Sequence, residues 1–315
     1  MRNRITQRQR WVWLASSVSA VAAILLCRLN WLWVLVGGSV VCLYYLYIEK
    51  KLDGRGLTEH MNGVTGKVCA VIMIFWFVLV MGYCACLADS AFPMVDGFPG
   101  LGWVLLALSA YGSRKGIRAC AGCSGILCLF LFGLYALVAA FSLPDVQIEH
   151  LRPEGRWTQA ISAAVAFLFP FGVWMMPVSR QTGKGRWWVL LLPVLAAALA
   201  AITAGVLSPQ LARTVQVPLY ELSRSVSVLG VVERIEPLLC AAMTMGLFCL
   251  LTSLACACQM LADRIENWKW SGSLCCLGAA GAMYAARVLP GGVWVVGNLL
   301  IFLLFPAVLV SFKKR

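Results

Sequence analysis

The groups best suited to chemistry in this chain are hydroxyls and a helix-breaking motif inside apolar segments. One such segment, residues 158–179, carries the motif Phe-Pro-Phe-Gly in its middle, at 169–172. Proline removes a backbone donor and glycine relaxes backbone sterics, so the motif predicts an unwound stretch with free backbone groups at membrane depth. Half-helix ends of that kind receive small ligands or ions, and a simple kink in a packed helix is the alternative. The residues of this expected ligand site are Phe169, Pro170, Phe171, Gly172 and Val173.

Four hydroxyl residues complete the candidate ligand site. Ser16, Ser17 and Ser19 lie in the first apolar run, and Thr244 lies in a later one. Serine hydroxyls in membrane helices either contact a ligand or allow close helix packing, and packing is the commoner use. The first run has neither glycine nor proline, so no break is expected there.

The 14 cysteines mostly lie within apolar runs, where cysteine behaves as a small hydrophobic residue. Cys120 and Cys123 form a CxxC pair, but there is no second pair and no nearby histidine, whereas a structural zinc site needs four ligands. We expect neither a metal nor any other cofactor.

Ten apolar runs contain no Asp, Glu, Lys, Arg or His. Proton relays in membranes are usually built from ionisable residues, and an intramembrane enzyme needs a nucleophile with a base, paired acids or a metal. We therefore expect no enzymatic activity and no catalytic residue. The runs are 11–27, 31–48, 68–88, 99–113, 119–142, 158–179, 187–207, 237–262, 271–286 and 291–310.

Composition places these runs in a membrane. The chain has 315 residues, of which 61% are hydrophobic and 12% are charged, too apolar for a soluble core of this size. Most runs approach the ~20 residues that cross a bilayer. We predict a single all-α domain of ten transmembrane helices over residues 1–315, arranged as a 5+5 inverted repeat with halves of about 11–142 and 158–310.

The charge of +13 follows the same topology. If the N-terminus is cytoplasmic, the even-numbered connections and both tails hold most of the 26 basic residues, and the odd-numbered connections hold more than half of the 13 acidic ones. This asymmetry predicts that both termini are cytoplasmic. Because the charge is spread over short loops, we expect contact with membrane lipids and no nucleic-acid partner.

A polar stretch, Pro218 to Glu236, interrupts the apolar pattern between the seventh and eighth runs. Its aliphatic residues recur at helical spacing, which predicts an amphipathic helix in the membrane interface. Its charged residues either cap and anchor the next span or form a surface for a partner subunit. They include Glu221, Arg224, Glu233 and Arg234.

Five passages of the chain, in order, resemble the GerAB-type spore germination permeases. They are ITQRQ at 5–9, AYGSRKGIR at 110–118, LPD at 143–145, FPFG at 169–172 and the stretch at 218–236. The resemblance implies the fold of the amino acid-polyamine-organocation superfamily and a place in the spore inner membrane. It also implies the B-type subunit of a nutrient germinant receptor, which senses a small nutrient such as an amino acid beside A-type and C-type subunits.

Two positions depart from that family pattern. Val173 stands where the family usually has Glu, and the first run has serines and alanines where the family usually has Gly-x-Gly and Pro. Three functions therefore stay open. The chain is a germinant receptor subunit, an amino acid or solute permease of the same fold, or a structural pseudo-permease that binds no ligand.

Overall fold

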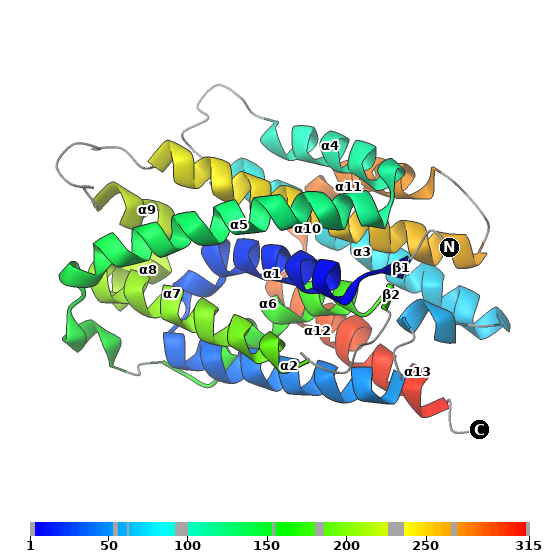
Figure 1. The fold of residues 1–315 in the computed structure, drawn as a ribbon, viewed down its shortest axis with the longest axis horizontal. Coiled ribbons are helices and arrows are strands. Elements are labelled where there is room, and N and C mark those ends of the chain that lie inside the picture. Colours follow the sequence, from blue (N-terminus) through cyan, green and yellow to red (C-terminus); the bar gives the residue numbers. More distant parts are fainter. Residues whose placement is uncertain are drawn as a thin grey trace.

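A computed structural model describes residues 4–52, 56–61, 63–91, 100–152, 155–179, 186–225, 236–265 and 270–312. The described chain is almost entirely helical, and most helices run along the long axis of the molecule (Figure 1). The α-helices are α1 (Gln7–Ile24), α2 (Trp31–Leu52), α3 (Gly63–Ala91), α4 (Leu101–Lys115), α5 (Ile117–Ser142), α6 (Thr158–Trp174), α7 (Leu191–Leu207), α8 (Pro209–Thr214), α9 (Pro218–Ser225), α10 (Glu236–Ile265), α11 (Ser271–Val288), α12 (Gly291–Asn298) and α13 (Phe305–Phe312).

Shorter elements connect the helices. A π-helix, η6 (Leu299–Leu304), joins α12 to α13 into one continuous helical segment. Two two-residue strands, β1 (Arg4–Ile5) and β2 (Val178–Ser179), pair in parallel. The 3₁₀ turns are η1 (Leu26–Arg28), η2 (Leu57–His60), η3 (Leu143–Asp145), η4 (Ile148–Leu151) and η5 (Arg186–Leu190).

The chain begins α1 with a capping box. The Thr6 hydroxyl accepts a hydrogen bond from the Gln9 backbone N–H at 3.3 Å, and Gln9 Oε1 accepts from the Thr6 N–H at 3.1 Å. This reciprocal pair satisfies two donors that the first helical turn leaves free. At the opposite kind of boundary, Gly116 ends α4 and starts α5 with φ of 87°, a left-handed conformation that favours glycine.

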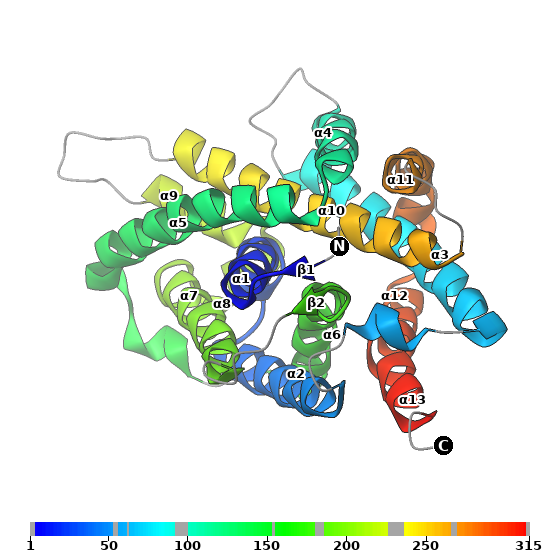
Figure 2. The ribbon, with the colours of Figure 1, turned by 45° about the vertical axis from the view of Figure 1, so that its right-hand side comes forward.

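Two groups of four helices make up the core. In the first, α1 and α2 each pack against α6 and α7; in the second, α3 and α4 each pack against α10 and α11. The groups meet where α1 contacts α10, and α5 lies across that junction. Figure 2 shows α1 nearly end-on, with α5, α6, α7 and α10 around it. Accordingly 78% of the apolar window in this first span is buried, as expected for a helix that is mostly apolar on all sides.

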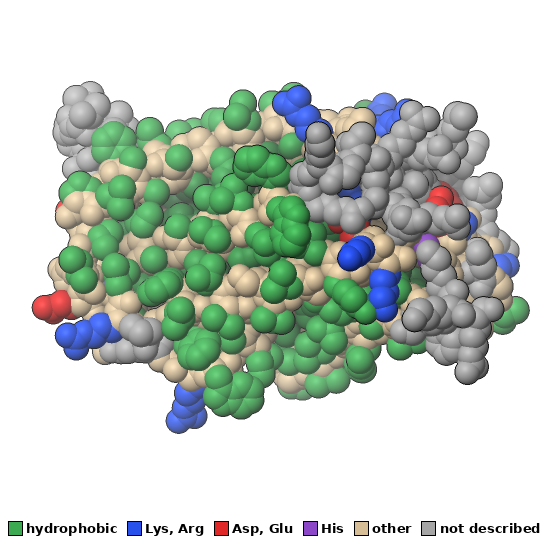
Figure 3. All heavy atoms as spheres, turned by 60° about the horizontal axis from the view of Figure 1, so that its bottom comes forward, with side chains coloured by type: hydrophobic (Ala, Val, Ile, Leu, Met, Phe, Trp, Pro, Cys, Tyr) green, Lys and Arg blue, Asp and Glu red, His purple; other side chains and the backbone are tan. Residues whose placement is uncertain are grey.

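Within the described residues, seven helical segments are long and apolar enough to cross a membrane. Figure 3 shows one face of the molecule, where hydrophobic side chains cover the middle and charged side chains lie mostly toward the ends. The chain is thus an integral, multi-pass membrane protein. Three further predicted spans correspond to helices outside that set, namely α4 with 15 residues, α6 with 17 and α11 with 18.

Two expectations about particular segments change. The predicted unwinding at Pro170–Gly172 is wrong, because α6 continues through Pro170 and ends at Trp174. The sixth predicted span also ends early, since Val178 and Ser179 form β2. The described part of the amphipathic stretch is helical, with Pro218–Ser225 in α9 and Glu236 at the start of α10. Residues 226–235, which include Glu233 and Arg234, lie outside the described residues.

Candidate functional site

A buried ion pair joins α1 to α2 near the end of the molecule where the chain begins. Arg10 Nη1 lies 2.8 Å from Glu49 Oε1, and the two residues are 5% and 4% exposed. Arg10 Nε donates to the Trp174 carbonyl at 2.9 Å, and the guanidinium lies over the Trp174 ring, 4.1 Å from its centroid. One acid, one carbonyl and one aromatic face therefore compensate the buried charge.

The segment after α6 is held at the same end by further backbone contacts. The Leu57 N–H donates to the Met175 carbonyl at 2.9 Å, and the Thr58 hydroxyl donates to the Met176 carbonyl at 3.1 Å. Pairing of β1 with β2 then ties the start of the chain to Val178 and Ser179. We call these contacts, together with the Arg10–Glu49 pair, the terminal clasp. They close this end around the C-terminus of α6.

The five motif residues of α6 face different surroundings. Phe169 lines a cavity described below. Phe171 stacks on Tyr45 of α2, with ring centroids 5.5 Å apart. A Cβ on Gly172 would lie 2.1 Å from Phe302 Cδ1, so glycine here allows α6 to approach η6. The motif is chiefly a packing device.

Ser17, Pro170 and Val173 do meet where α1 crosses α6, as the sequence predicted. The crevice between them is also lined by Trp13 and Trp174, and it has no room for a water molecule. Both indole N–H groups are buried without a hydrogen-bond partner in the described part of the chain. The crevice is therefore closed to a ligand in this conformation.

The predicted hydroxyls bond to their own helices. Ser16 and Ser17 donate to the Trp13 carbonyl, each at 3.0 Å, and Ser19 donates to the Ser16 carbonyl at 2.8 Å. Thr244 likewise donates to the Cys240 carbonyl at 2.8 Å in α10. This back-bonding satisfies the hydroxyls within apolar helices and leaves them their acceptor lone pairs only.

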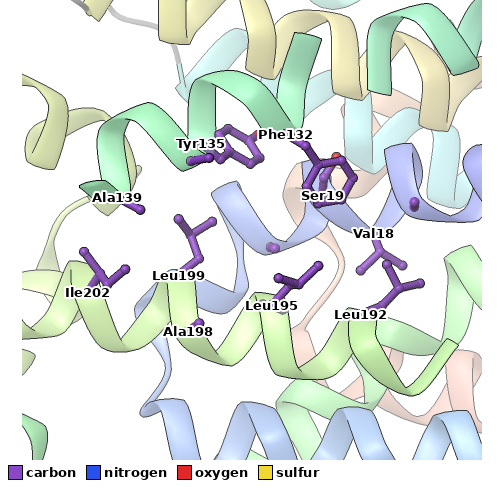
Figure 4. A pocket seen from close by; sticks show the side chains of 14 residues that line it. Val18, Ser19, Phe132, Tyr135, Ala139, Leu192, Leu195, Ala198, Leu199 and Ile202 are labelled. Atoms are coloured by element: carbon purple, nitrogen blue, oxygen red, sulfur yellow. The ribbon is translucent and has the colours of Figure 1, made fainter. Parts of the chain in front are cut away.

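Ser19 also lines an apolar cavity of about 160 Å³ between α1, α5 and α7 (Figure 4). The labelled side chains around it are mainly leucine, isoleucine, valine and alanine, with Phe132 and Tyr135 from α5. The Tyr135 hydroxyl is buried and has no partner among the described residues. The walls suit a hydrocarbon group, such as part of a lipid chain, better than a polar nutrient.

A larger cavity of about 280 Å³ lies at the other end of α1 and has more polar walls. It is bounded by η1, α3, α6 and α12, and Arg28 is the charged side chain among the described residues that line it. Tyr83, Phe169 and Trp294 supply aromatic surface. We call it the Arg28 cavity. The remaining lining residues are Leu25, Leu29, Val80, Ser162, Val165, Ala166, Gly291, Val295 and Asn298.

The predicted surface residues and the CxxC pair lie elsewhere. Glu221 and Arg224 of α9 form an exposed ion pair at 3.3 Å, three residues apart on the helix. Cys120 is buried, with its sulfur 3.6 Å from the Cys256 sulfur, whereas Cys123 is exposed. Within the described residues, no group of three or more histidine, cysteine or acidic side chains is placed to hold a metal ion.

Sequence reasoning missed Arg10, Glu49 and Arg28 as site residues. Each borders an apolar run, and the run boundaries excluded them. The capping box at Thr6 and Gln9 was the available signal for Arg10, because it shows that the helix begins at Gln7. No local signal marks the Arg28 cavity, whose walls come from four separate elements.

The fold and the cavity beside α6 define a permease-like membrane protein. The structure resembles a Na⁺-coupled sialic acid symporter in a substrate-bound outward-open state, with a TM-score of 0.60, 14% identity, and coverage of 96% of this chain and 80% of that one. It also resembles Mhp1, a nucleobase-cation-symport-1 family transporter in a closed conformation with bromovinylhydantoin bound. That match has a TM-score of 0.52, 13% identity, and coverage of 95% and 75%.

A family model described as "Spore germination protein" matches residues 14–286. The chain therefore belongs to the spore germination permease family, which confirms the resemblance seen in the sequence. No curated protein matches the sequence. The two solved structures are transporters, and at 14% and 13% identity their likeness to this chain is one of fold.

Proposed function

We propose that this protein is the B-type subunit of a spore germinant receptor, which binds a small nutrient within the membrane and signals through A-type and C-type subunits. Membership of the spore germination family supports this role. A receptor subunit in the spore inner membrane meets nutrients that have crossed the outer layers of the spore. The permease fold then serves as a ligand-binding scaffold rather than a pump.

We further propose ten spans in a 5+5 inverted repeat, with α4, α6 and α11 completing the set. The packing pattern supports this arrangement, because it nearly repeats when each helix is exchanged for its counterpart five spans away. Helix α3 packs on α11 as α10 packs on α4, and α2 packs on α6 as α7 packs on α1 with η1. Helix α5 packs on α1 as α12 and η6 pack on α6. Transporters with inverted repeats share this property.

Both termini are proposed to be cytoplasmic. Strand β1 and the end of α13 lie at the same end of the molecule (Figure 1), as an even number of spans requires. Basic residues are concentrated in the connections at that end, in keeping with the positive-inside rule. In this orientation the terminal clasp faces the cytoplasm, and the Arg28 cavity faces the outside.

The observation that carries the proposal is this one-sided arrangement. The cytoplasmic end of α6 is held by an ion pair, three hydrogen bonds to backbone carbonyls and a strand pair. The outer half of α6 borders the Arg28 cavity through Ser162, Ala166 and Phe169. Such an arrangement suits a protein that receives a nutrient from outside, because a ligand bound beside the outer half of α6 can shift the population of its conformations.

Nutrient-triggered dipicolinate release from spores of the source organism tests the proposal. Release should fail for at least one nutrient in a deletion strain and return with the wild-type gene. It should not return with Ala166→Phe, which fills the Arg28 cavity, and it should return with Ala119→Phe, a change at an exposed position of α5. Normal release from the deletion strain to every nutrient would contradict the receptor role.

Partner subunits provide a second readout of the same proposal. Affinity-tagged protein purified from spore membranes should carry the A-type and C-type subunits with it. Charge reversal at Glu221 and Arg224 on the exposed face of α9 tests whether this surface contributes to the contact. Recovery of the protein without either subunit, from membranes that contain both, would argue against the complex.

Two alternatives rest on specific observations. The likeness to two transporters supports an amino acid or solute permease, which predicts uptake of the nutrient into proteoliposomes and dependence on a coupling ion. The filled crevice at Trp13, Trp174 and Val173 supports a pseudo-permease that binds nothing there. The pseudo-permease predicts that spores with a filled Arg28 cavity germinate normally while deletion spores do not.

A further inference from the structure

The Arg28 cavity carries an electrostatic imbalance. Arg28 lies in η1, the turn that follows α1, and is one of the residues that line the cavity. Among the described lining residues no Asp or Glu faces it. By contrast, Arg10 at the other end of α1 is matched by Glu49 at 2.8 Å. A positive wall without an acid favours an anionic occupant.

The hydrogen bonds of Arg28 are also incomplete. Nη2 donates to the Gln216 carbonyl, which ties the side chain to the segment between α8 and α9. Nε is buried and has no hydrogen-bond partner among the described residues. A buried donor without a partner costs free energy, and a guanidinium presents its donors in a planar fork that suits carboxylate oxygens. Because Nε has almost no accessible surface, a ligand carboxylate in the cavity would balance the charge of the guanidinium rather than bond to this nitrogen.

The walls opposite Arg28 combine aromatic surface with two polar groups, a backbone carbonyl and an asparagine side chain. Tyr83, Phe169 and Trp294 form aromatic surface on α3, α6 and α12. Ala166 lines the cavity, and its carbonyl lacks the usual helical hydrogen bond because Pro170 has no N–H to donate. Asn298 is oriented by the hydrogen bond that its Oδ1 accepts from Trp76 Nε1 at 3.1 Å.

Size sets the remaining limit. An apolar cavity of roughly 150 Å³ holds a benzene molecule. At about 280 Å³, the Arg28 cavity holds a ligand of the size of a branched or aromatic amino acid, or of the corresponding acid without the amino group.

We propose that the Arg28 cavity binds a small carboxylate, with Arg28 holding the carboxylate group and Tyr83, Phe169 and Trp294 contacting its apolar body. This inference rests on the proposed function, because it names the chemical class of the nutrient and the residue that selects it. It places the ligand on the outer side of α6 rather than in the filled crevice between α1 and α6. Arg28 is thus the residue that determines specificity.

Binding to purified protein in lipid nanodiscs tests the assignment. Phenylacetate, phenylalanine and phenylacetamide share the aromatic body, and the first two carry a carboxylate. We expect phenylacetate or phenylalanine to bind and the amide to bind at least 10-fold more weakly. Preference for phenylalanine over phenylacetate would show that an ammonium group is also recognised, and equal binding would show that the carboxylate suffices. Amide binding as tight as that of the acids, or no binding by either acid at millimolar concentrations, would overturn the proposal.

Variants of Arg28 connect that preference to the residue. Arg28→Gln should weaken carboxylate binding about 10-fold to 100-fold and leave amide binding unchanged. Arg28→Lys keeps the charge but loses the fork, so an intermediate loss is expected. Arg213→Gln is the matched control, because Arg213 lies exposed on α8 at the same end of the molecule. Unchanged carboxylate affinity in a folded Arg28→Gln protein would overturn the assignment.

Failure of this inference can be told apart from failure of the proposed function. If deletion spores lose their response but the purified protein prefers no carboxylate, the receptor role stands and the ligand class is wrong. If carboxylates bind through Arg28 but Arg28→Gln spores germinate normally, the cavity is a binding site without the receptor role. A thermal melting curve in the same nanodiscs confirms that each variant is folded.

Discussion

The two arginines near the ends of α1 have opposite environments. Arg10 and Arg28 are roughly 27 Å apart along the helix direction, from the rise per residue. Arg10 is buried against Glu49 and lies over the Trp174 ring, and it closes the end where the chain begins. Arg28 faces a cavity and has an unpartnered Nε in the described structure. The same side chain is structural at one end and available to a ligand at the other.

The difference lies in what each element supplies. Helix α2 continues to Leu52 and so brings Glu49 beside Arg10, whereas the elements around Arg28 supply aromatic rings and an amide. A buried charge needs a partner, and where the protein supplies none, a ligand or water has to. The clasp and the cavity therefore make different predictions for the removal of charge.

The largest expected effect comes from breaking the Arg10–Glu49 pair. Glu49→Gln or Arg10→Met leaves one buried charge uncompensated and should lower the free energy of unfolding by about 3–5 kcal/mol. Chemical unfolding in detergent micelles measures this loss. Arg28→Met should cost about 1 kcal/mol, because the hydrogen bond to Gln216 is the main one lost.

The double variant Arg10→Met with Glu49→Leu sharpens the same comparison. Replacement of both partners by apolar residues of similar volume is often close to neutral, so the double variant should be more stable than either single one. Independent, additive losses in the two single variants would show that Arg10 and Glu49 do not stabilise each other.

The next effect concerns Gly172, which the sequence placed in a ligand site. A Cβ at this position meets the Phe302 ring, so Gly172→Ala should cost about 1–3 kcal/mol through overpacking. Gly281→Ala on α11 is the control, because a Cβ there meets nothing within 4 Å. Unfolding measurements on both variants decide between packing and ligand contact. A stable Gly172→Ala protein that fails to bind nutrient would indicate that Gly172 is part of the ligand site.

Much of the helical framework could be predicted from the sequence, because apolar runs without charges mark membrane helices directly. The run 119–142 corresponds to α5, Ile117–Ser142, and the run 187–207 contains α7, Leu191–Leu207. The same rule failed at helix ends. The rule ends each run at the first charged residue. It therefore left Arg10 outside the first run and Glu49 outside the second, although α1 contains Arg10 and α2 contains Glu49.

The candidate site could be predicted only in part, for a reason of distance along the chain. Sequence reasoning grouped Ser17 with Pro170 and Val173 in one candidate site, and the structure places these three residues around one crevice. Sequence reasoning could not predict that Trp13 and Trp174 also line this crevice and that no space for a ligand is left in it. The predicted helix break is wrong as well, because α6 stays helical through Pro170, and Phe171 in the same turn stacks on Tyr45 of α2.

A smaller effect tests the clasp without touching its charges. Thr58→Val removes the hydroxyl that donates to the Met176 carbonyl and preserves the shape of the side chain, so the free energy of unfolding should fall by about 1 kcal/mol. Thr214→Val is a matched control, since that hydroxyl bonds within its own helix at an exposed position. Equal, negligible losses in the two variants would indicate that η2 does not help to hold the end of α6.

The smallest effects are expected for the predicted hydroxyls. Ser16→Ala, Ser17→Ala and Thr244→Val remove groups that bond to their own helices, so stability should change by about 0.5 kcal/mol or less and carboxylate affinity by less than about 2-fold. The same nanodisc binding assay compares them with Arg28→Gln. If Ser17→Ala abolishes binding while Arg28→Gln does not, the ligand lies in the crevice between α1 and α6. Trp13 and Trp174 would then have to move aside when it binds. The ligand would bind near the terminal clasp rather than in the Arg28 cavity.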